Sequence, residues 1–113
     1  MRFPAARRRE TAQGQAEFEL EVDPGLLGFQ GHFPEDPILP GVVQVDWAIH
    51  FGREAFGPMG AFAGIRNLKF MEIIRPGEPL ALRLTLDPAG IRFAFQGSQG
   101  AKSSGTLRYS QEA

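Results

Sequence analysis

The segment "GHFPEDPILPGVVQVDWA" (residues 31–48) holds the side chains best suited to chemistry in this 113-residue chain. His32 is one of only two histidines and titrates near neutral pH, so it can act as a general base. Gly41 follows Pro40 at the expected start of a helix, where backbone N–H groups favour developing negative charge. Asp46 lies within that otherwise apolar helix, where burial would raise its pKa and suit a proton donor. Base, oxyanion donor and acid together predict removal of a proton beside a carbonyl and loss of a hydroxyl group.

Each of these residues also has a structural explanation. A lone histidine beside Phe33 can be a satisfied core or turn residue, and a buried carboxylate can form a structural ion pair. Asp46 and His50 are four apart on one helical face, a spacing that can hold a metal ion. The chain has no cysteine and no clear third ligand, so we expect no metal site. Residue types alone leave the catalytic and the structural interpretations open.

The elements that must position these residues follow from the hydrophobic pattern. Residues 41 to about 56 predict a helix, with Pro40 at its first turn and apolar residues in nearly every direction, which indicates a buried helix. Alternating or extended patterns predict five strands, at 15–23, 62–74, 80–86, 91–96 and 102–110. One strand, one buried helix and four further strands indicate an α+β fold, in which a curved antiparallel sheet wraps around one long central helix.

Composition limits the remaining classes of protein. The length predicts a single domain over residues 1–113, and residues 1–14, with Arg2 and the basic run at 7–9, are expected to be a flexible or loosely packed segment. The net charge of -1 gives no global attraction to nucleic acid, and no stretch approaches the roughly 20 apolar residues of a membrane helix. We therefore expect a cytoplasmic protein that neither binds nucleic acid nor inserts into membranes.

The opening segment closely resembles the signature of the beta-hydroxyacyl-acyl-carrier-protein dehydratases, which are hot-dog-fold enzymes of fatty acid synthesis. In that family a His-Phe-Pro-x-x-Pro-x-x-Pro-Gly-Val run leads into the central helix, which carries a Glu or Asp fourteen residues after the His. His32 and Asp46 keep this spacing. The stretch "GIRNLKFMEIIRPGEPLAL" (residues 64–82) resembles a later part of the family more weakly. The Val-Gln-Val-Asp-Trp-Ala sequence is most similar to a dehydratase-like branch linked to aryl polyene synthesis.

The resemblance implies a reaction and a role for each residue. His32 would take the alpha proton of a (3R)-hydroxyacyl thioester, and the Gly41 N–H would hold the thioester carbonyl as its charge grows. Asp46 would assist departure of the hydroxyl as water, which leaves a trans-2-enoyl thioester. The acyl chain would lie in an apolar tunnel, with four residues expected to contact it: Phe33, Pro40, Val42 and Trp47.

The resemblance also implies partners and cofactors. The histidine and the carboxylate come from different subunits in the family, which implies a homodimer with two sites at its interface and leaves higher assembly open. No metal or organic cofactor is implied, because the phosphopantetheine arm arrives with the acyl carrier protein. His50 stands where the family often has Gln, so it could interact with Asp46 one turn away.

Two other functions remain open. A hot-dog acyl thioesterase would use a carboxylate with a positioned water, although the Pro-Gly-Val signature disfavours this reaction. A non-catalytic module could instead bind acyl carrier protein or stabilise another subunit. Four basic residues could then meet an acidic partner, although a solvated surface explains them as well: Arg53, Arg66, Lys69 and Arg75.

Overall fold

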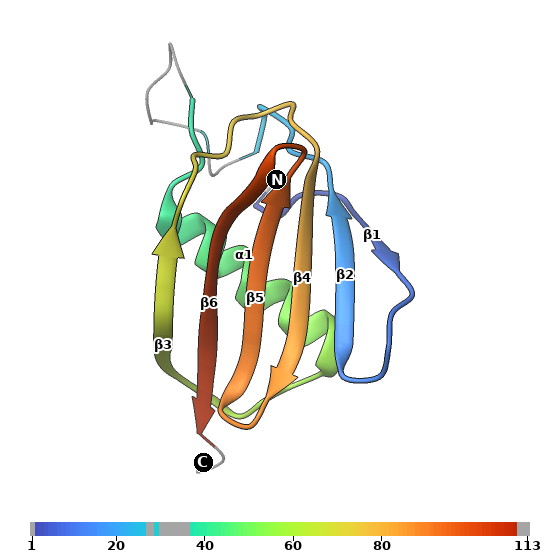
Figure 1. Ribbon diagram of the computed structural model, residues 1–113, viewed down its shortest axis with the longest axis vertical. Coiled ribbons are helices and arrows are strands. Elements are labelled where there is room, and N and C mark those ends of the chain that lie inside the picture. Colours follow the sequence, from blue (N-terminus) through green and yellow to red (C-terminus); the bar gives the residue numbers. More distant parts are fainter. Residues whose placement is uncertain (1, 27–28, 30–36, 111–113) are drawn as a thin grey trace.

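The computed structural model describes residues 2–26, 29 and 37–110, and in this part of the chain a six-stranded sheet curves over one long helix (Figure 1). The elements follow the order β1 (Ala6–Arg9), β2 (Gln15–Leu20), α1 (Gly41–Phe56), β3 (Ala61–Phe70), β4 (Leu80–Asp87), β5 (Gly90–Gly97) and β6 (Gly100–Ser110). The strand order in the sheet is β1-β2-β4-β5-β6-β3, and every neighbouring pair is antiparallel. The predicted α+β architecture is confirmed.

Helix α1 begins and ends where the sequence predicts. Pro40 precedes it with an extended backbone (φ -61°, ψ 149°), which a proline adopts readily just before a helix. Gly57 ends it with φ 77°, a left-handed conformation that suits glycine, and its N–H donates to the Arg53 carbonyl oxygen at 2.8 Å. A proline start and a glycine end therefore fix the length of the helix that carries the candidate site.

The core lies between α1 and the inner face of the sheet. Leu80, Leu82 and Leu84 of β4 are buried at alternating positions, as the period of two predicted. They pair with alternating residues of β5, two of which, Phe93 and Phe95, are also buried. Each fully buried side chain of this size contributes about 1.5–3 kcal/mol to folding, so this layer holds α1 firmly against the sheet.

The expectation that α1 is buried all round is wrong for the isolated chain. Its buried residues are Gln44, Val45, Trp47, Ala48, Phe51 and Gly52. Val42, Arg53 and Glu54 are exposed, and Asp46 and His50 are half-buried. The sheet covers one side of the helix only, so apolar residues such as Val42 are left on a face that another surface could cover.

The expectation of a flexible or loosely packed N-terminal segment is corrected for residues 2–9. Ala6–Arg9 form β1, an edge strand that pairs with β2 and places Arg7 opposite Glu19 and Arg9 opposite Glu17. The Arg7 guanidinium lies 2.6 Å from Glu19, and this hydrogen bond lowers the pKa of that carboxyl. Cross-strand pairs of opposite charge stabilise such a ribbon, and β1 brings the residues before it to the helix.

Strand β3 forms the opposite edge of the sheet and ends at Phe70, earlier than the expected 62–74. Its register with β6 shifts twice, between Phe62 and Gly64 and between Arg66 and Lys69, and Asn67 has φ 56°. Such bulges twist and bend an edge strand. β3 nevertheless keeps large apolar side chains exposed: Phe62, Leu68 and Phe70.

Among the described helical residues, no helix is long and apolar enough to span a membrane.

Candidate functional site

Two predicted site residues, His32 and Phe33, lie outside the described residues. The remaining predicted residues all lie on α1 or immediately before it, between Pro40 and Trp47. The geometry of the site is therefore built from the start of this helix and from its side away from the sheet.

The N-terminus of α1 is held by backbone contacts. Val43 and Gln44 donate their N–H groups to the Pro40 carbonyl oxygen at 3.1 and 3.2 Å. Pro40 supplies no side-chain cap to the helix. Helix N-termini leave N–H groups that can bind an anion or a polarised carbonyl. The predicted oxyanion role for Gly41 therefore has the required backbone setting.

The lack of a side chain at Gly41 has a cause that the sequence did not reveal. A Cβ atom added there would lie 2.5 Å from Cζ of Phe70, at the end of β3. The Phe70 ring therefore occupies the space that a side chain at this position would need. Packing between α1 and β3 thus requires a small residue at this position independently of catalysis.

A buried polar chain anchors the helix start to the sheet. The Ser103 hydroxyl of β6 donates to Gln44 Oε1 at 2.7 Å, and Gln44 Nε2 donates to the Leu39 carbonyl oxygen at 3.1 Å. Leu39 in turn donates its N–H to the Ile74 carbonyl oxygen at 2.8 Å. Because these groups are buried and satisfied, they fix the last residues before the helix as well as its first turn.

Asp46 is not the buried residue that the sequence predicted. Its side chain is 34% exposed and forms a two-point ion pair with Arg2, which is 65% exposed. Arg2 donates from Nε to Oδ2 at 3.1 Å and from Nη2 to Oδ1 at 2.8 Å. The burial premise fails because the sheet covers only the other side of α1, and a residue of the N-terminal segment is the carboxylate's partner.

His50 also points to a partner other than Asp46. Its ring stacks on Phe3 with centroids 3.7 Å apart and an interplanar angle of 8°. Its Nε2 lies 3.3 Å from Glu54 Oε1, one turn further along the helix. The interaction between Asp46 and His50 that their spacing allowed is therefore replaced in the structure by separate contacts to Arg2 and Phe3.

The predicted substrate-contacting residues on the helix have three different environments. Pro40 is half-buried, and Val42 is 78% exposed on the side away from the sheet. Trp47 is fully buried in the core, and its indole N–H donates to the Arg2 carbonyl oxygen at 3.3 Å. Of the three, Val42 offers an apolar surface directly, and contact of any of them with a substrate stays a prediction.

Two groups of α1 suit acid–base chemistry, which are the backbone N–H groups at its start and the Asp46 carboxylate. Asp46 follows Gly41 by five residues, which corresponds to about 7.5 Å of rise along the helix axis. An oxyanion donor at the helix end and a carboxylate at this distance could address two parts of one small thioester. The predicted general base of such a reaction is His32, which lies outside the described residues.

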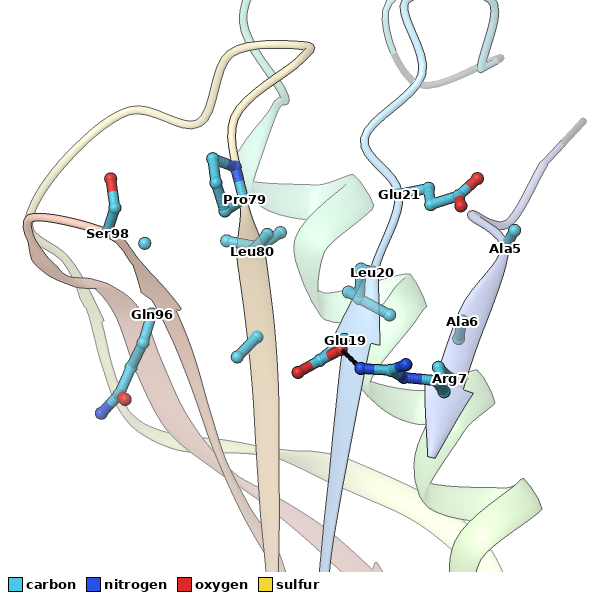
Figure 2. Close-up of a pocket in the computed structure, with 12 residues that line it drawn as sticks. Ala5, Ala6, Arg7, Glu19, Leu20, Glu21, Pro79, Leu80, Gln96 and Ser98 are labelled. Atoms are coloured by element: carbon cyan, nitrogen blue, oxygen red, sulfur yellow. Dashed lines mark hydrogen bonds and ion pairs between the residues drawn. The ribbon is translucent and has the colours of Figure 1, made fainter. Parts of the chain in front are cut away.

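One pocket of the described part of the chain lies elsewhere. It has a volume of about 740 Å³ and is lined by the ends of β1, β2, β4 and β5, including Arg7, Glu19 and Gln96 (Figure 2). Glu19 lies on the sheet face away from α1, since its neighbours Phe18 and Leu20 belong to the core. Of the predicted site residues that the structure describes, none lines this pocket, so we do not assign the chemistry to it.

Arg2 is the site residue that sequence reasoning missed. The basic run beside Arg2 at the N-terminus predicts a flexible or loosely packed segment, which gives Arg2 no role. A weaker signal was present in the charges. Arg7 and Arg9 are two apart, as are Glu17 and Glu19, and Gly14 lies between the two pairs. This pattern fits an antiparallel hairpin, and such a hairpin places Arg2 near the helix.

Comparisons with known protein sequences point to the same dehydratases as the signature does. The model of the ApeI-like family, described as ApeI dehydratase, matches residues 7–106. The chain is 37% identical over 84 residues to the 3-hydroxyacyl-acyl-carrier-protein dehydratase FabZ of Caldanaerobacter subterraneus subsp. tengcongensis, covering 68% of this chain and 58% of that protein. It is 36% identical over 86 residues to FabZ of Clostridium novyi, covering 66% and 61%. The chain thus spans about three-fifths of the length of these curated relatives.

The structural comparison covers nearly the whole chain. A chain of the dehydratase heterocomplex ApeI:P from Xenorhabdus doucetiae superposes with a TM-score of 0.85 and 34% sequence identity, covering 93% of this chain and 96% of that one. The family model spans the segment with His32, Gly41 and Asp46. The chain therefore belongs to the ApeI-like dehydratase family and has the hot-dog fold.

Proposed function

We propose that this protein is a hydro-lyase that removes water from a (3R)-hydroxyacyl thioester carried by an acyl carrier protein. The observation that carries the proposal is the His32-to-Asp46 spacing within the family match, with a helix N-terminus at Gly41 between them. The relatives named as 3-hydroxyacyl-acyl-carrier-protein dehydratases support the same reaction. The resemblance of the signature supports a role in fatty acid or aryl polyene synthesis as part of the proposal.

The proposed step uses three groups of the protein. His32 accepts the alpha proton as the Cα–H bond breaks, and the N–H at Gly41 stabilises the negative charge on the thioester oxygen. Asp46 gives a proton to the departing hydroxyl as the Cβ–O bond breaks, so the products are water and a trans-2-enoyl thioester. The proton then passes from His32 back to Asp46 to restore the resting state. The step needs no metal or organic cofactor, because phosphopantetheine belongs to the substrate.

We propose further that two copies of the chain form a homodimer with β3 at the interface. β3 is an edge strand with exposed apolar side chains, and Val42 lies exposed on the helix that β3 flanks (Figure 1). Such an edge favours pairing with another strand. The interface would bring His32 of one subunit to Asp46 of the other and would cover the open side of α1.

The cytoplasm, where carrier-bound substrates are made, is the proposed location.

The test is an assay for reversible hydration with purified protein. Crotonyl-acyl-carrier protein should gain the mass of one water, and 3-hydroxybutyryl-acyl-carrier protein should lose it. His32→Ala and Asp46→Asn should each lower the rate by about 100-fold or more, because each removes a proton-transfer group. Asp87→Asn is the matched control, since Asp87 is also a half-buried aspartate paired with an arginine, Arg92 at 3.6 Å. This control should retain the wild-type rate.

Three results would contradict the proposal. Wild-type rates in both His32→Ala and Asp46→Asn would remove the assigned groups from the reaction. Release of a free thiol from the acyl-carrier-protein substrate, measured with a thiol reagent, would instead identify a thioesterase. Binding of the carrier protein without turnover would indicate a non-catalytic module.

A further inference from the structure

The N-terminal segment contacts three residues of α1, which are Asp46, Trp47 and His50. Arg2 forms the two-point ion pair with Asp46, and its carbonyl oxygen accepts the Trp47 indole N–H. Phe3 stacks on His50, and the Arg2 guanidinium lies 4.8 Å from the centre of the Phe3 ring. Residues 2 and 3 therefore contact little more than one turn of the helix, from Asp46 to His50.

Strand β1 anchors the segment that makes these contacts. The Glu21 N–H donates to the Ala5 carbonyl oxygen at 2.9 Å, directly before β1 pairs with β2. Pro4, which is buried, restricts the backbone between this anchor and Phe3. Arg2 thus approaches Asp46 from a short, anchored segment and not from a free tail.

The geometry of the pair matters more than its strength. Exposed ion pairs contribute little to stability, and Arg2 is largely exposed. A guanidinium that meets both carboxylate oxygens nevertheless fixes the plane of the carboxylate, which a single point charge does not. On the open side of a helix, Asp46 would otherwise sample several rotamers.

The pair is compatible with the proton transfer assigned to Asp46. Each oxygen of a carboxylate has two lone-pair sites, and the two Arg2 donors occupy one on each oxygen. One site on each oxygen remains for a substrate hydroxyl. When Asp46 carries the proton, its carbonyl oxygen can still accept from Arg2 while its O–H points to the hydroxyl that leaves.

We propose that Arg2 is a positioning residue, which holds the Asp46 carboxyl in the orientation needed to give its proton to the leaving hydroxyl. This inference rests on the proposed dehydratase function and adds a residue that the His-to-Asp signature does not contain. Proton transfer is sensitive to displacements of about 1 Å, so loss of the guanidinium fork lowers the rate of the chemical step. Substrate affinity depends on other contacts and stays unchanged.

Steady-state kinetics of Arg2→Ala, Arg2→Lys and Arg8→Ala test the proposal. Arg2→Ala should lower kcat about 10- to 100-fold with less than a twofold change in KM, as expected for a residue that orients a catalytic group. Arg2→Lys should recover only part of kcat, because lysine restores the charge without the fork. Arg8, an exposed arginine of the same segment, is the matched control, and its alanine variant should behave as wild type. Equal kcat values for wild type and Arg2→Ala would overturn the proposal.

A second measurement is independent of activity. In ¹⁵N-labelled protein, the Arg2 Nε–H signal should shift and exchange faster with water in Asp46→Ala but not in Asp87→Ala. If the wild type is active but its Arg2 signal does not change in Asp46→Ala, the positioning role is overturned and the proposed function stays intact. An inactive wild type whose Arg2 signal depends on Asp46 would overturn the proposed function while the contact stands. Thermal unfolding of each variant identifies any loss that comes from misfolding.

Discussion

At the scale of single residues, Gly41 and Asp46 show how one short segment serves packing and chemistry together. Gly41 is required by the Phe70 ring, and Asp46 is held by Arg2, so each predicted catalytic residue has a structural neighbour far away in sequence. Chemical type and spacing along the segment predicted both residues as members of the family signature, and their catalytic roles stay predictions. Their neighbours come from β3 and from the N-terminus, and no local pattern could name them.

Gly41→Ala separates the two causes for glycine at this position. The new Cβ would meet three ring atoms of Phe70 at 2.5–3.0 Å, so the ring must move. We expect a loss of about 1 kcal/mol in the free energy of unfolding, typical of mild overpacking. In a Phe70→Ala background the loss should vanish, since alanine suits a helix better than glycine. Urea denaturation of the four proteins measures this coupling, and an equal loss in both backgrounds would contradict it.

At the scale of elements, the sequence predicted what alternation and helix ends encode. The period of two in 80–86 and 91–96 identified β4 and β5, and Pro40 with Gly57 identified both ends of α1. β1 escaped prediction because all four of its side chains are exposed, which leaves no apolar period. The exposed side of α1 was mispredicted for the opposite reason. Its apolar residues suit burial, but the single chain has no surface that covers them.

The polar chain between α1 and β6 yields a prediction for element packing. Gln44→Leu should lower the free energy of unfolding by about 2 kcal/mol, because it leaves the buried Ser103 hydroxyl and the Leu39 carbonyl without their partner. Ser103→Ala should cost about 1 kcal/mol, and adding it to Gln44→Leu should cost nothing more, since the orphaned hydroxyl is then gone. Chemical denaturation of the two single variants and the double variant measures this. Simple additivity of the two losses would show that the side chains act independently.

At the scale of the whole molecule, the single chain leaves several large apolar side chains exposed. A chain of 113 residues buries only about two-thirds of its unfolded surface, which makes an additional apolar contact valuable. The unused apolar surface gathers along β3 and the segment that follows it: Phe62, Leu68, Phe70, Met71 and Ile73. The bulges of β3 bend this edge without removing its apolar character. A second subunit at this edge would cover these apolar side chains and increase the apolar surface that is buried.

The proposed dimer predicts different effects for two leucines of nearly equal exposure. Leu68 on β3 is 41% exposed, and Leu86 on β4 is 43% exposed but separated from the β3 edge by β5 and β6. Leu68→Lys would bury a charge at the interface, so the dimer dissociation constant should rise at least about 10-fold. Leu86→Lys changes charge and exposed area equally and should leave the dimer intact. Light scattering after size-exclusion chromatography, over a range of protein concentrations, distinguishes the two. Equal dissociation of both variants would place the second subunit somewhere other than β3. A monomeric wild type would contradict the homodimer.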